Sequence, residues 1–494
     1  MGEKKTTAVH GIHTAKIWEI GFYALNNTAT NIYMFAFVYI SYFLVGIVGV
    51  GVVLAGSITT IMRMWDGVTD PFIGYIVDKT NTKFGKNRPF ILIGNLILLV
   101  TSFIIYWVTP ALPQGIRFPF YVVIYMLYII GYTCQCVVTK SAQTCLTNDP
   151  KQRPIFTMFD AVFNVVLFAV FPVIVTNVLL PMYGGNDAFT NPDFFKGLWK
   201  ICASMSMLFS ILAIIGLRRK DRLEYYGTGV VQKITLKDYW EVLRKNRAIQ
   251  MLVISASSDK LSGSMKGNSI IYVMLFGIIC GNYSLYGTFS AVSSIPIVIV
   301  TLLLMNFIAR RMGQKQAMLV GTWGSIISAV LLFLLLLLGD PTQLSFTNIG
   351  FFTIAFMGLN IINAGFSGVA GNIVIPMTAD CADYEVYRSG KYVPGLMGTL
   401  FSFVDKMISS LAGTFVSLMI AAIGFTTTQP TPDTPYSTEI FWVTMACYIG
   451  APLVGWICNI VALKFYPLTK EKMEEIQDKI AEIKEKARAE AAAQ

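Results

Sequence analysis

Three residues of one apolar segment, TIMRMWDGVTDPFIGYIVDKT, have the side-chain types and the spacing to bind a cation: Asp66, Thr69 and Asp70. Asp66 and Asp70 are four residues apart and share one helix face, and Arg63 and Thr69 each lie three residues from Asp66, near that face. Two carboxylates and a hydroxyl are hard oxygen ligands for a small alkali cation, and two neighbouring carboxylates can instead share a proton. The structural alternative is an Arg63–Asp66 salt bridge, which leaves Asp70 without a role.

The chain around this segment has the composition of an integral membrane protein. Of its 494 residues, 55% are hydrophobic and 13% are charged, whereas soluble proteins carry about a quarter charged residues. Apolar runs of about 20 residues recur along the chain, and such a run crosses a hydrocarbon core ~30 Å thick as a helix. An ionisable side chain inside one costs roughly 2.5–3.5 kcal/mol on insertion scales. Each such side chain is therefore a candidate functional residue.

Twelve apolar runs separated by polar loops predict twelve transmembrane helices. The predicted spans are 20–43, 46–76, 90–109, 118–147, 154–181, 197–216, 249–279, 284–308, 317–338, 349–379, 396–424 and 438–465. Lys and Arg concentrate in alternate loops, such as 79–88, 218–222 and 310–315, and the positive-inside rule makes these loops cytoplasmic. An even number of helices then places both termini in the cytoplasm. The net charge of +10 therefore reflects topology and does not indicate a nucleic-acid partner.

The sequence also predicts two repeated halves. FGKNRPFILIG (84–94) follows the second span, and MGQKQAMLVG (312–321) follows the eighth, the equivalent place in the second half. Six-helix repeats are typical of the major facilitator architecture, with the solute site near the middle of the membrane between the halves. We therefore expect an all-α membrane protein of this architecture. Its predicted parts are an N-terminal half (1–217), a cytoplasmic middle loop (218–248), a C-terminal half (249–466) and a cytoplasmic tail (467–494) that forms a solvated helix.

Other polar residues inside the apolar spans are candidates for a solute site. The first span offers a hydrogen-bonding face for a polyhydroxyl solute, with helix packing as the alternative; its residues are Asn26, Asn27, Thr28 and Asn31. Lys140 in the fourth span and Lys406 in the eleventh can neutralise the second-span carboxylates or bind a solute, with snorkelling to the interface as the alternative. The roles of two further acids stay open: Asp160 and Asp259.

The sequence indicates a carrier rather than an enzyme or a nucleotide-driven pump. It contains no phosphate-binding glycine loop, nucleophile elbow or zinc-ligand spacing. Its eight cysteines lie mostly in apolar runs, which indicates packing as free thiols, and its polar start predicts no cleavable signal peptide. We expect no cofactor. The expected partners are a small sugar-like solute and the lipid bilayer, with the chain as a monomer.

Two stretches of the sequence resemble one transporter family. RMWDGVTDPFIGYIVDKTNTKFGKNRP (63–89) is similar to the second-helix signature of the glycoside–pentoside–hexuronide:cation symporter family of the major facilitator superfamily. MTADCADYEVYRSGKYVPGLMGTLFSFVDK (377–406) is similar to that family's loop between helices 10 and 11 and the start of helix 11. The resemblance implies secondary active transport in the cell membrane, in which a sugar, glycoside or hexuronide and H⁺, Na⁺ or Li⁺ move together by alternating access.

The resemblance also implies roles for individual residues. Asp66 and Asp70 match the family's two cation-binding carboxylates, Thr69 lies at an adjacent position of that site, and Lys406 matches the helix 11 lysine near both sites. The candidate substrate-binding residues are Asn27, Thr28, Asn31, Cys136, Lys140, Ser402 and Lys406. The residues that fall where the family builds cytoplasmic charge locks are Arg63, Arg153, Asp380 and Asp383.

The chain departs from melibiose permease-like members of the family at the solute site. Thr28 replaces the helix 1 aspartate, Cys136 replaces the helix 4 acid, and Lys140 replaces an aromatic residue. Because an ammonium group near Asp66 and Asp70 can neutralise a carboxylate, H⁺ coupling is favoured and Na⁺ at these two residues is the alternative. The departures also favour a solute with an anionic group that Lys140 holds. A lysolipid-like solute and an uncoupled facilitator remain the alternative functions.

Overall fold

The computed structural model describes residues 13–80, 82–147, 152–222, 225, 244–389 and 394–479. Their regular structure is helical, with one isolated bridge between Thr82 and Gly85. The helices form two compact units. The first unit comprises Met1–Val230, Tyr286–Ala291 and Ile420–Thr434, and the second comprises Val231–Leu285, Val292–Met419 and Pro435–Gln494.

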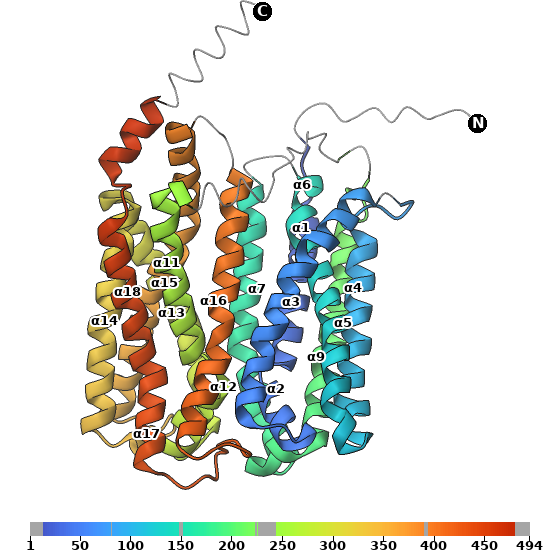
Figure 1. Cartoon of the computed structure of the whole chain (residues 1–494), viewed down its shortest axis with the longest axis vertical. Helices are drawn as coiled ribbons and strands as arrows, with labels where there is room; N and C mark the ends of the chain where they lie inside the picture. The colour runs from blue at the N-terminus through green and yellow to red at the C-terminus, as the bar shows by residue number, and fades with distance from the viewer. Residues whose placement is uncertain are drawn as a thin grey trace, which may run out of the picture. The chain divides into compact units, whose positions relative to one another are not determined.

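The first unit is a bundle of long helices joined by short turns. Its α-helices are α1 (Ile17–Ala36), α2 (Ile40–Phe43), α3 (Val52–Lys79), α4 (Arg88–Phe103), α5 (Gln114–Ser141), α6 (Gln143–Leu146), α7 (Arg153–Ile174), α8 (Leu180–Met182) and α9 (Pro192–Leu217). Wider π-helical turns continue three of them at Leu44–Val48, Ile104–Val108 and Val175–Leu179, and 3₁₀ turns lie at Thr109–Ala111 and Gly185–Thr190. Helix α1 packs against α7 and α9, and α5 packs against α3 and α4 (Figure 1).

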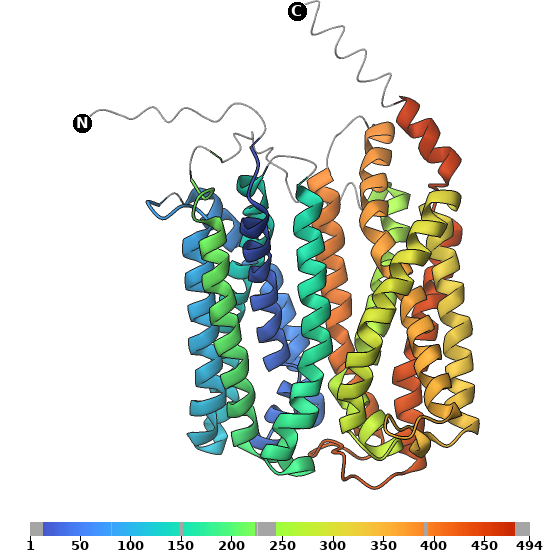
Figure 2. The ribbon, with the colours of Figure 1, turned by 180° about the vertical axis from the view of Figure 1, so that it is seen from behind.

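The second unit is built in the same way. Its α-helices are α11 (Arg247–Lys266), α12 (Ser269–Tyr272), α13 (Ser284–Met312), α14 (Gln314–Leu338), α15 (Phe351–Ser389), α16 (Pro394–Ala422), α17 (Thr438–Met445) and α18 (Ala451–Phe465). The π-helical turns are Val273–Ile279 and Ala446–Gly450, and a 3₁₀ turn lies at Pro341–Gln343. Helix α11 packs against α15 and α18, and α14 packs against the same two helices, which Figure 2 shows from behind.

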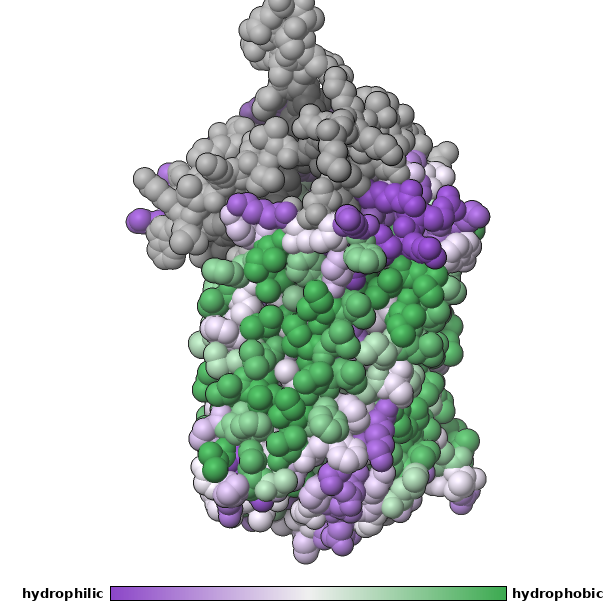
Figure 3. All heavy atoms as spheres, turned by 90° about the vertical axis from the view of Figure 1, so that its right-hand side faces the viewer, coloured by the Kyte–Doolittle hydropathy of each residue, from purple (hydrophilic) through white to green (hydrophobic). Residues whose placement is uncertain are grey.

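Each of the twelve predicted spans overlaps a helix or a run of helical turns, although the span 46–76 begins before α3, which starts at Val52. Ten of these segments, among the residues that the structure describes, are long and apolar enough to cross a membrane. The other two are α3 and the α11–α12 pair, each of which carries several charged residues that lower its hydropathy. Figure 3 shows a broad hydrophobic band between polar ends on one face of the molecule. In the described part of the chain, these ten segments together with α3 and the α11–α12 pair account for the twelve predicted spans, so the chain is an all-α membrane protein.

Two predicted spans differ in detail from the helices of the structure. The span 249–279 is not one helix, because α11 ends at Lys266 and the Asn268 side chain caps α12 by accepting a hydrogen bond from the Ile270 N–H at 3.0 Å. The span 349–379 is too short, because α15 continues to Ser389. A span predicted from hydropathy ends where charged residues begin. The helix itself continues past that point, and its residues Cys381 and Glu385 are buried.

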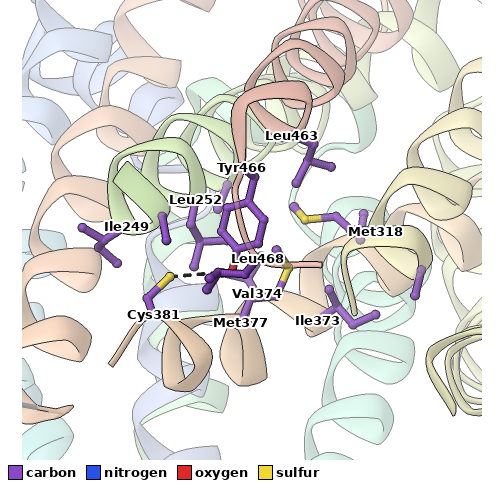
Figure 4. Packing of buried hydrophobic residues seen from close by; sticks show 14 of the residues in the cluster. Ile249, Leu252, Met318, Ile373, Val374, Met377, Cys381, Leu463, Tyr466 and Leu468 are labelled. Carbon is purple, nitrogen blue, oxygen red and sulfur yellow. Dashed lines mark hydrogen bonds between the residues drawn. The ribbon is translucent and has the colours of Figure 1, made fainter. Parts of the chain in front are cut away.

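The first residues of the tail pack onto the second unit instead of forming a fully solvated helix. Residues 470–479 are helical, and Leu468 and Ile476 are buried in a cluster that joins α11, α14, α15 and α18. Figure 4 shows Tyr466 and Leu468 within this cluster, where the Tyr466 hydroxyl lies 3.7 Å from the Cys381 thiol. Because Glu and Lys alternate with the apolar residues of the tail, the sequence pattern does not predict these apolar contacts.

The start of α3 is fixed by the segment that follows α16. The Val52 N–H donates to the Thr426 carbonyl oxygen at 2.9 Å, and the Tyr42 hydroxyl donates to the Pro430 carbonyl oxygen at 2.8 Å. The preceding helical turn ends at Gly49, whose φ of 83° lies in the left-handed region that glycine adopts without a steric penalty. These contacts position the helix that carries the candidate cation-binding residues.

A buried carboxylate fixes the N-terminus of α4. Asp221 is fully buried and accepts hydrogen bonds from the backbone N–H groups of Asn87 and Arg88 at 3.0 and 2.9 Å. Its carboxylate also lies 3.5 Å from the Arg88 guanidinium. An anion is favoured at a helix N-terminus, where the first N–H groups lack partners within the helix. Gly85 has φ 101°, and a Cβ atom there would clash with this carboxylate.

Candidate functional site

Helix α3 presents Asp66 to α5 in a cluster of side-chain oxygens. The Asp66 side chain is 3% exposed, and Thr133 of α5 donates a hydrogen bond from its hydroxyl to Asp66 Oδ1 at 3.1 Å. The Thr69 hydroxyl lies 3.2 Å from the Thr133 hydroxyl and donates to the Asp66 carbonyl oxygen at 3.1 Å. Trp65 links the same two helices, since its indole N–H donates to the Met126 carbonyl oxygen at 3.2 Å. One carboxylate and two hydroxyls thus converge at the contact between α3 and α5.

Arg63 lies beside this cluster but forms no close hydrogen bond with the Asp66 carboxylate. Arg63 Nη1 lies 3.8 Å from Asp66 Oδ2, which is longer than the roughly 2.7–2.9 Å of a close charge-assisted hydrogen bond. The Arg63 side chain is 40% exposed and lines a pocket of about 270 Å³. The salt bridge that the sequence offered as the structural alternative is therefore present in a loose form.

The oxygen cluster has the chemistry of a site for a proton or an alkali cation. Carboxylate and hydroxyl oxygens are the ligands that hard cations prefer. A charged carboxylate inside the membrane also raises the free energy of the protein unless a partner neutralises it. Asp70, half-buried, follows one turn along α3. The structure therefore brings Asp66 and Thr69 together, as the resemblance implies, and adds Thr133. A lone hydroxyl in an apolar span usually bonds to its own helix, so the sequence does not single out Thr133.

We expect Thr133→Val to weaken binding of the coupling cation by about 10-fold or more, because a hydrogen bond to a charged group contributes roughly 1.5–3 kcal/mol. Thr133→Ser keeps the hydroxyl and should retain most of the affinity. The measurement is the cation concentration that gives half-maximal solute uptake in proteoliposomes. Equal behaviour of the Val and Ser variants would show that the hydroxyl does not contribute to cation binding.

The polar face predicted on α1 is paired with α7. The Asn27 side-chain amide donates to Asp160 Oδ1 at 2.7 Å, and one turn further Asn31 donates to Asn164 Oδ1, also at 2.7 Å. All four side chains are half-buried, so each keeps part of its surface accessible. Asp160, whose role the sequence leaves open, is therefore part of the α1–α7 contact.

Thr28 does not join Asn27 and Asn31. It is buried and lines a different surface of α1, a groove of about 610 Å³ with walls of aromatic and aliphatic side chains such as Phe22, Phe159 and Val162. Thr28 is adjacent to Asn27, and adjacent residues point about 100° apart on a helix. The predicted role of Thr28 in the solute site stays a prediction.

The predicted cytoplasmic charge lock is described only in part. Arg63 lies near the middle of the 28-residue helix α3. Asp383 Oδ2 accepts a hydrogen bond from Gln477 of the tail at 2.7 Å, and Asp380 lines a pocket with Lys315 and Lys470. The two acids lie in the second unit, and pairing with Arg63 stays a prediction.

The remaining candidate residues are described only in part. Cys136 on α5 and Lys406 on α16 are half-buried. The side chains of Lys140, Arg153 and Ser402 lie outside the described part of the chain. Their predicted roles stay predictions.

The second unit contains an ion pair that the sequence did not predict. Lys260 of α11 forms an ion pair with Asp405 of α16, and the carboxylate is buried whereas the ammonium group is largely exposed. Nearby on α11, Lys266 donates to Asn363 Oδ1 at 2.8 Å and lies 4.7 Å above the Tyr448 ring. Asp259, the other open acid, lies on α11 and is half-buried. These pairs involve residues more than 90 positions apart, so no local spacing reveals them.

We expect Lys260→Ala to lower the stability of the protein by about 1–3 kcal/mol, because it leaves the buried Asp405 carboxylate without its partner. The double variant Lys260→Ala/Asp405→Asn removes the unpaired charge and should be more stable than the single variant. Thermal unfolding of the purified protein in detergent measures both. Strictly additive losses would contradict the pairing.

The helical architecture and the intramembrane cluster of charged and hydroxyl groups define a membrane transporter of the major facilitator type. The crystal structure of the nucleoside transporter NupG has the same fold, with a TM-score of 0.61 over 92% of this chain and 100% of that chain, at 12% sequence identity. A family described as MFS/sugar transport protein matches residues 22–470. The chain belongs to this family.

Curated relatives agree with the resemblance. The chain is 24% identical to the glucuronide carrier protein homolog of Escherichia coli (strain K12) over 92% of this chain and 93% of the relative. It is 22% identical to a putative glycoside/cation symporter of the same organism over 92% of each chain. The assignment to the glycoside–pentoside–hexuronide:cation symporters of the major facilitator superfamily is confirmed, and the protein is a multi-pass secondary transporter.

Proposed function

We propose that the protein couples the movement of a glycoside or hexuronide to a cation, with H⁺ favoured over Na⁺, by alternating access. The observation that carries the proposal is the Asp66 carboxylate, buried in a membrane helix with the Thr133 and Thr69 hydroxyls beside it. A buried carboxylate is stable when it binds a proton or a cation, and loading and release of that ion can drive a cycle. We assign the coupling site to Asp66, Thr69, Asp70 and Thr133.

The solute class is supported by the names of the relatives and by the polar groups of α1. Two relatives are named as a glucuronide carrier homolog and a putative glycoside/cation symporter. The half-buried amides of Asn27 and Asn31 supply donors and acceptors of the kind that sugar hydroxyls bind. We include Lys140, Cys136, Ser402 and Lys406 in the proposed solute site on the resemblance alone.

The test measures ion movement that accompanies solute entry without an imposed ion gradient. Purified protein is reconstituted into vesicles that contain a pH-sensitive dye, and 4-nitrophenyl β-D-glucuronide or 4-nitrophenyl β-D-glucoside is added outside. H⁺ symport predicts acidification of the lumen on addition of the transported solute. Uptake of radioactive Na⁺ in place of acidification would make Na⁺ the coupling ion. Solute entry with neither change would contradict symport and indicate a facilitator.

We further propose that both termini face the cytoplasm and that the chain acts as a monomer. The alternation of basic loops supports the orientation through the positive-inside rule. A protease added outside intact cells should leave a C-terminal epitope tag uncut. Cleavage of the tag would contradict the proposed orientation.

A further inference from the structure

We infer that Arg63 binds the carboxylate of an acidic sugar in a tyrosine-lined pocket of the first unit. The inference rests on the proposed function, because it assigns a substrate class and a positively charged subsite to that transporter. It gives Arg63 a role in selecting the solute, in place of the cytoplasmic lock that the resemblance implies.

The pocket lies where α1, α3 and α5 meet. The side chains that line it include Phe37, Arg63, Asp66, Tyr125, Tyr128 and Tyr132. The volume of about 270 Å³ lies just below the roughly 300–1,000 Å³ of pockets for drug-sized ligands. A pocket of this size suits a single sugar ring, with any second group of a glycoside outside it.

Aromatic rings form much of the pocket wall. The rings of Phe37 and Tyr125 are stacked, with centroids 5.4 Å apart and an angle of 8° between their planes. Tyr128 packs on the same phenylalanine, with ring centroids 4.3 Å apart. The Tyr132 hydroxyl lies 3.4 Å from the Met34 sulfur. A sugar ring has an apolar C–H face and polar edges, which match aromatic faces beside tyrosine hydroxyls.

The accessible charge of the pocket is positive. Arg63 and Asp66 are the charged residues among its described lining, yet the Arg63 side chain is 40% exposed whereas that of Asp66 is 3% exposed. The Asp66 carboxylate is turned toward Thr133, which donates to its Oδ1, while the Arg63 group stands 3.8 Å from Oδ2. A solute that enters the pocket therefore meets the guanidinium group and not the carboxylate.

A guanidinium group is suited to a carboxylate on the solute. It offers five N–H donors in a planar fork that fits a carboxylate with two parallel hydrogen bonds. The 3.8 Å separation from Asp66 leaves donors available for this second anion. A carboxylate in a membrane interior needs such a partner, because an isolated charge is strongly disfavoured there. The pocket thus combines a wall for one sugar ring with a cation for its acidic group.

The test compares two sugars that differ only in this acidic group. Binding of 4-nitrophenyl β-D-glucuronide and of 4-nitrophenyl β-D-glucoside to the purified full-length protein is measured by isothermal titration calorimetry. We expect Arg63→Gln to weaken glucuronide binding about 10- to 100-fold and to change glucoside binding less than about threefold. Arg63→Lys, which keeps the charge but loses the fork, should lie between. Arg311→Gln, at an exposed arginine of α13, is the matched control.

The outcomes separate this inference from the proposed function. An equal loss of affinity for both sugars in Arg63→Gln would overturn the inference, because Arg63 would then stabilise the pocket without binding the carboxylate of the sugar. An unchanged glucuronide affinity, or a wild-type protein that binds the glucoside but not the glucuronide, would overturn it while leaving glycoside symport intact. Binding of neither sugar by the wild type would overturn both.

Discussion

Asp66→Asn is expected to abolish concentrative uptake of the solute while leaving the protein folded. The amide keeps the size of the side chain and can still contact Thr133, but it carries no charge to bind H⁺ or Na⁺. A tenfold accumulation of solute requires about 1.4 kcal/mol of coupling free energy, which the variant cannot take from an ion gradient. The internal-to-external solute ratio under an imposed gradient should therefore fall from about 10 or more to about 1.

The control for this variant is Asp193→Asn, which changes the same groups in a carboxylate that is 64% exposed. It should accumulate solute as the wild type does. Exchange of labelled for unlabelled solute across the membrane, measured without an ion gradient, tests whether Asp66→Asn still binds and moves the solute. Gradient-driven accumulation by Asp66→Asn at the wild-type level would remove Asp66 from the coupling site.

Asp221→Ala is expected to cause the largest loss of stability among the substitutions considered. The carboxylate accepts hydrogen bonds from the first backbone N–H groups of α4 and neutralises Arg88 within a buried site. Its removal leaves those donors and a buried charge without partners, which costs about 3 kcal/mol or more. Thermal unfolding of the purified protein in detergent should show a clear fall in the midpoint temperature.

Gly85→Ala provides an independent test of the same contact. Its φ of 101° is strained for alanine, and the added Cβ would press on the Asp221 carboxylate. Gly115→Ala is the matched control, since an added Cβ there meets no atom within 4 Å. If the Gly85 and Asp221 variants lose stability and the Gly115 variant does not, the result supports the contact between the Asp221 carboxylate and the N-terminus of α4. Near-wild-type stability of Asp221→Ala would contradict it.

The fold was largely predictable because lipid imposes a simple rule on the sequence. A chain that crosses the bilayer must satisfy its backbone within helices, so apolar runs of sufficient length mark the spans. The same rule identifies Asp66 and Asp70 as unusual, since a charged pair four residues apart within such a run needs a functional reason. Two spans fail a purely compositional test: α3 and α11–α12, each of which carries several charged residues.

The contacts between helices were not predictable from local spacing. Thr133 reaches Asp66 from another helix, and Lys260 reaches Asp405 across 145 positions, so neither pair leaves a periodic signal. Thr28 lines a groove that does not include Asn27 or Asn31, which bond to α7, and nothing in its local sequence indicates this. The burial of Ile476 likewise depends on the surface of the second unit and not on the charge pattern of the tail.

The most direct test of cation-coupled symport is accumulation of a radiolabelled glucuronide in proteoliposomes under an imposed pH gradient, an imposed Na⁺ gradient or neither. H⁺-coupled symport predicts that the wild-type protein concentrates the solute above its external level under an inward H⁺ gradient, and that a protonophore collapses the accumulation. Concentration driven by Na⁺ alone would keep symport and replace the ion. If the internal solute concentration only reaches the external one under every gradient, cation-coupled symport would be contradicted.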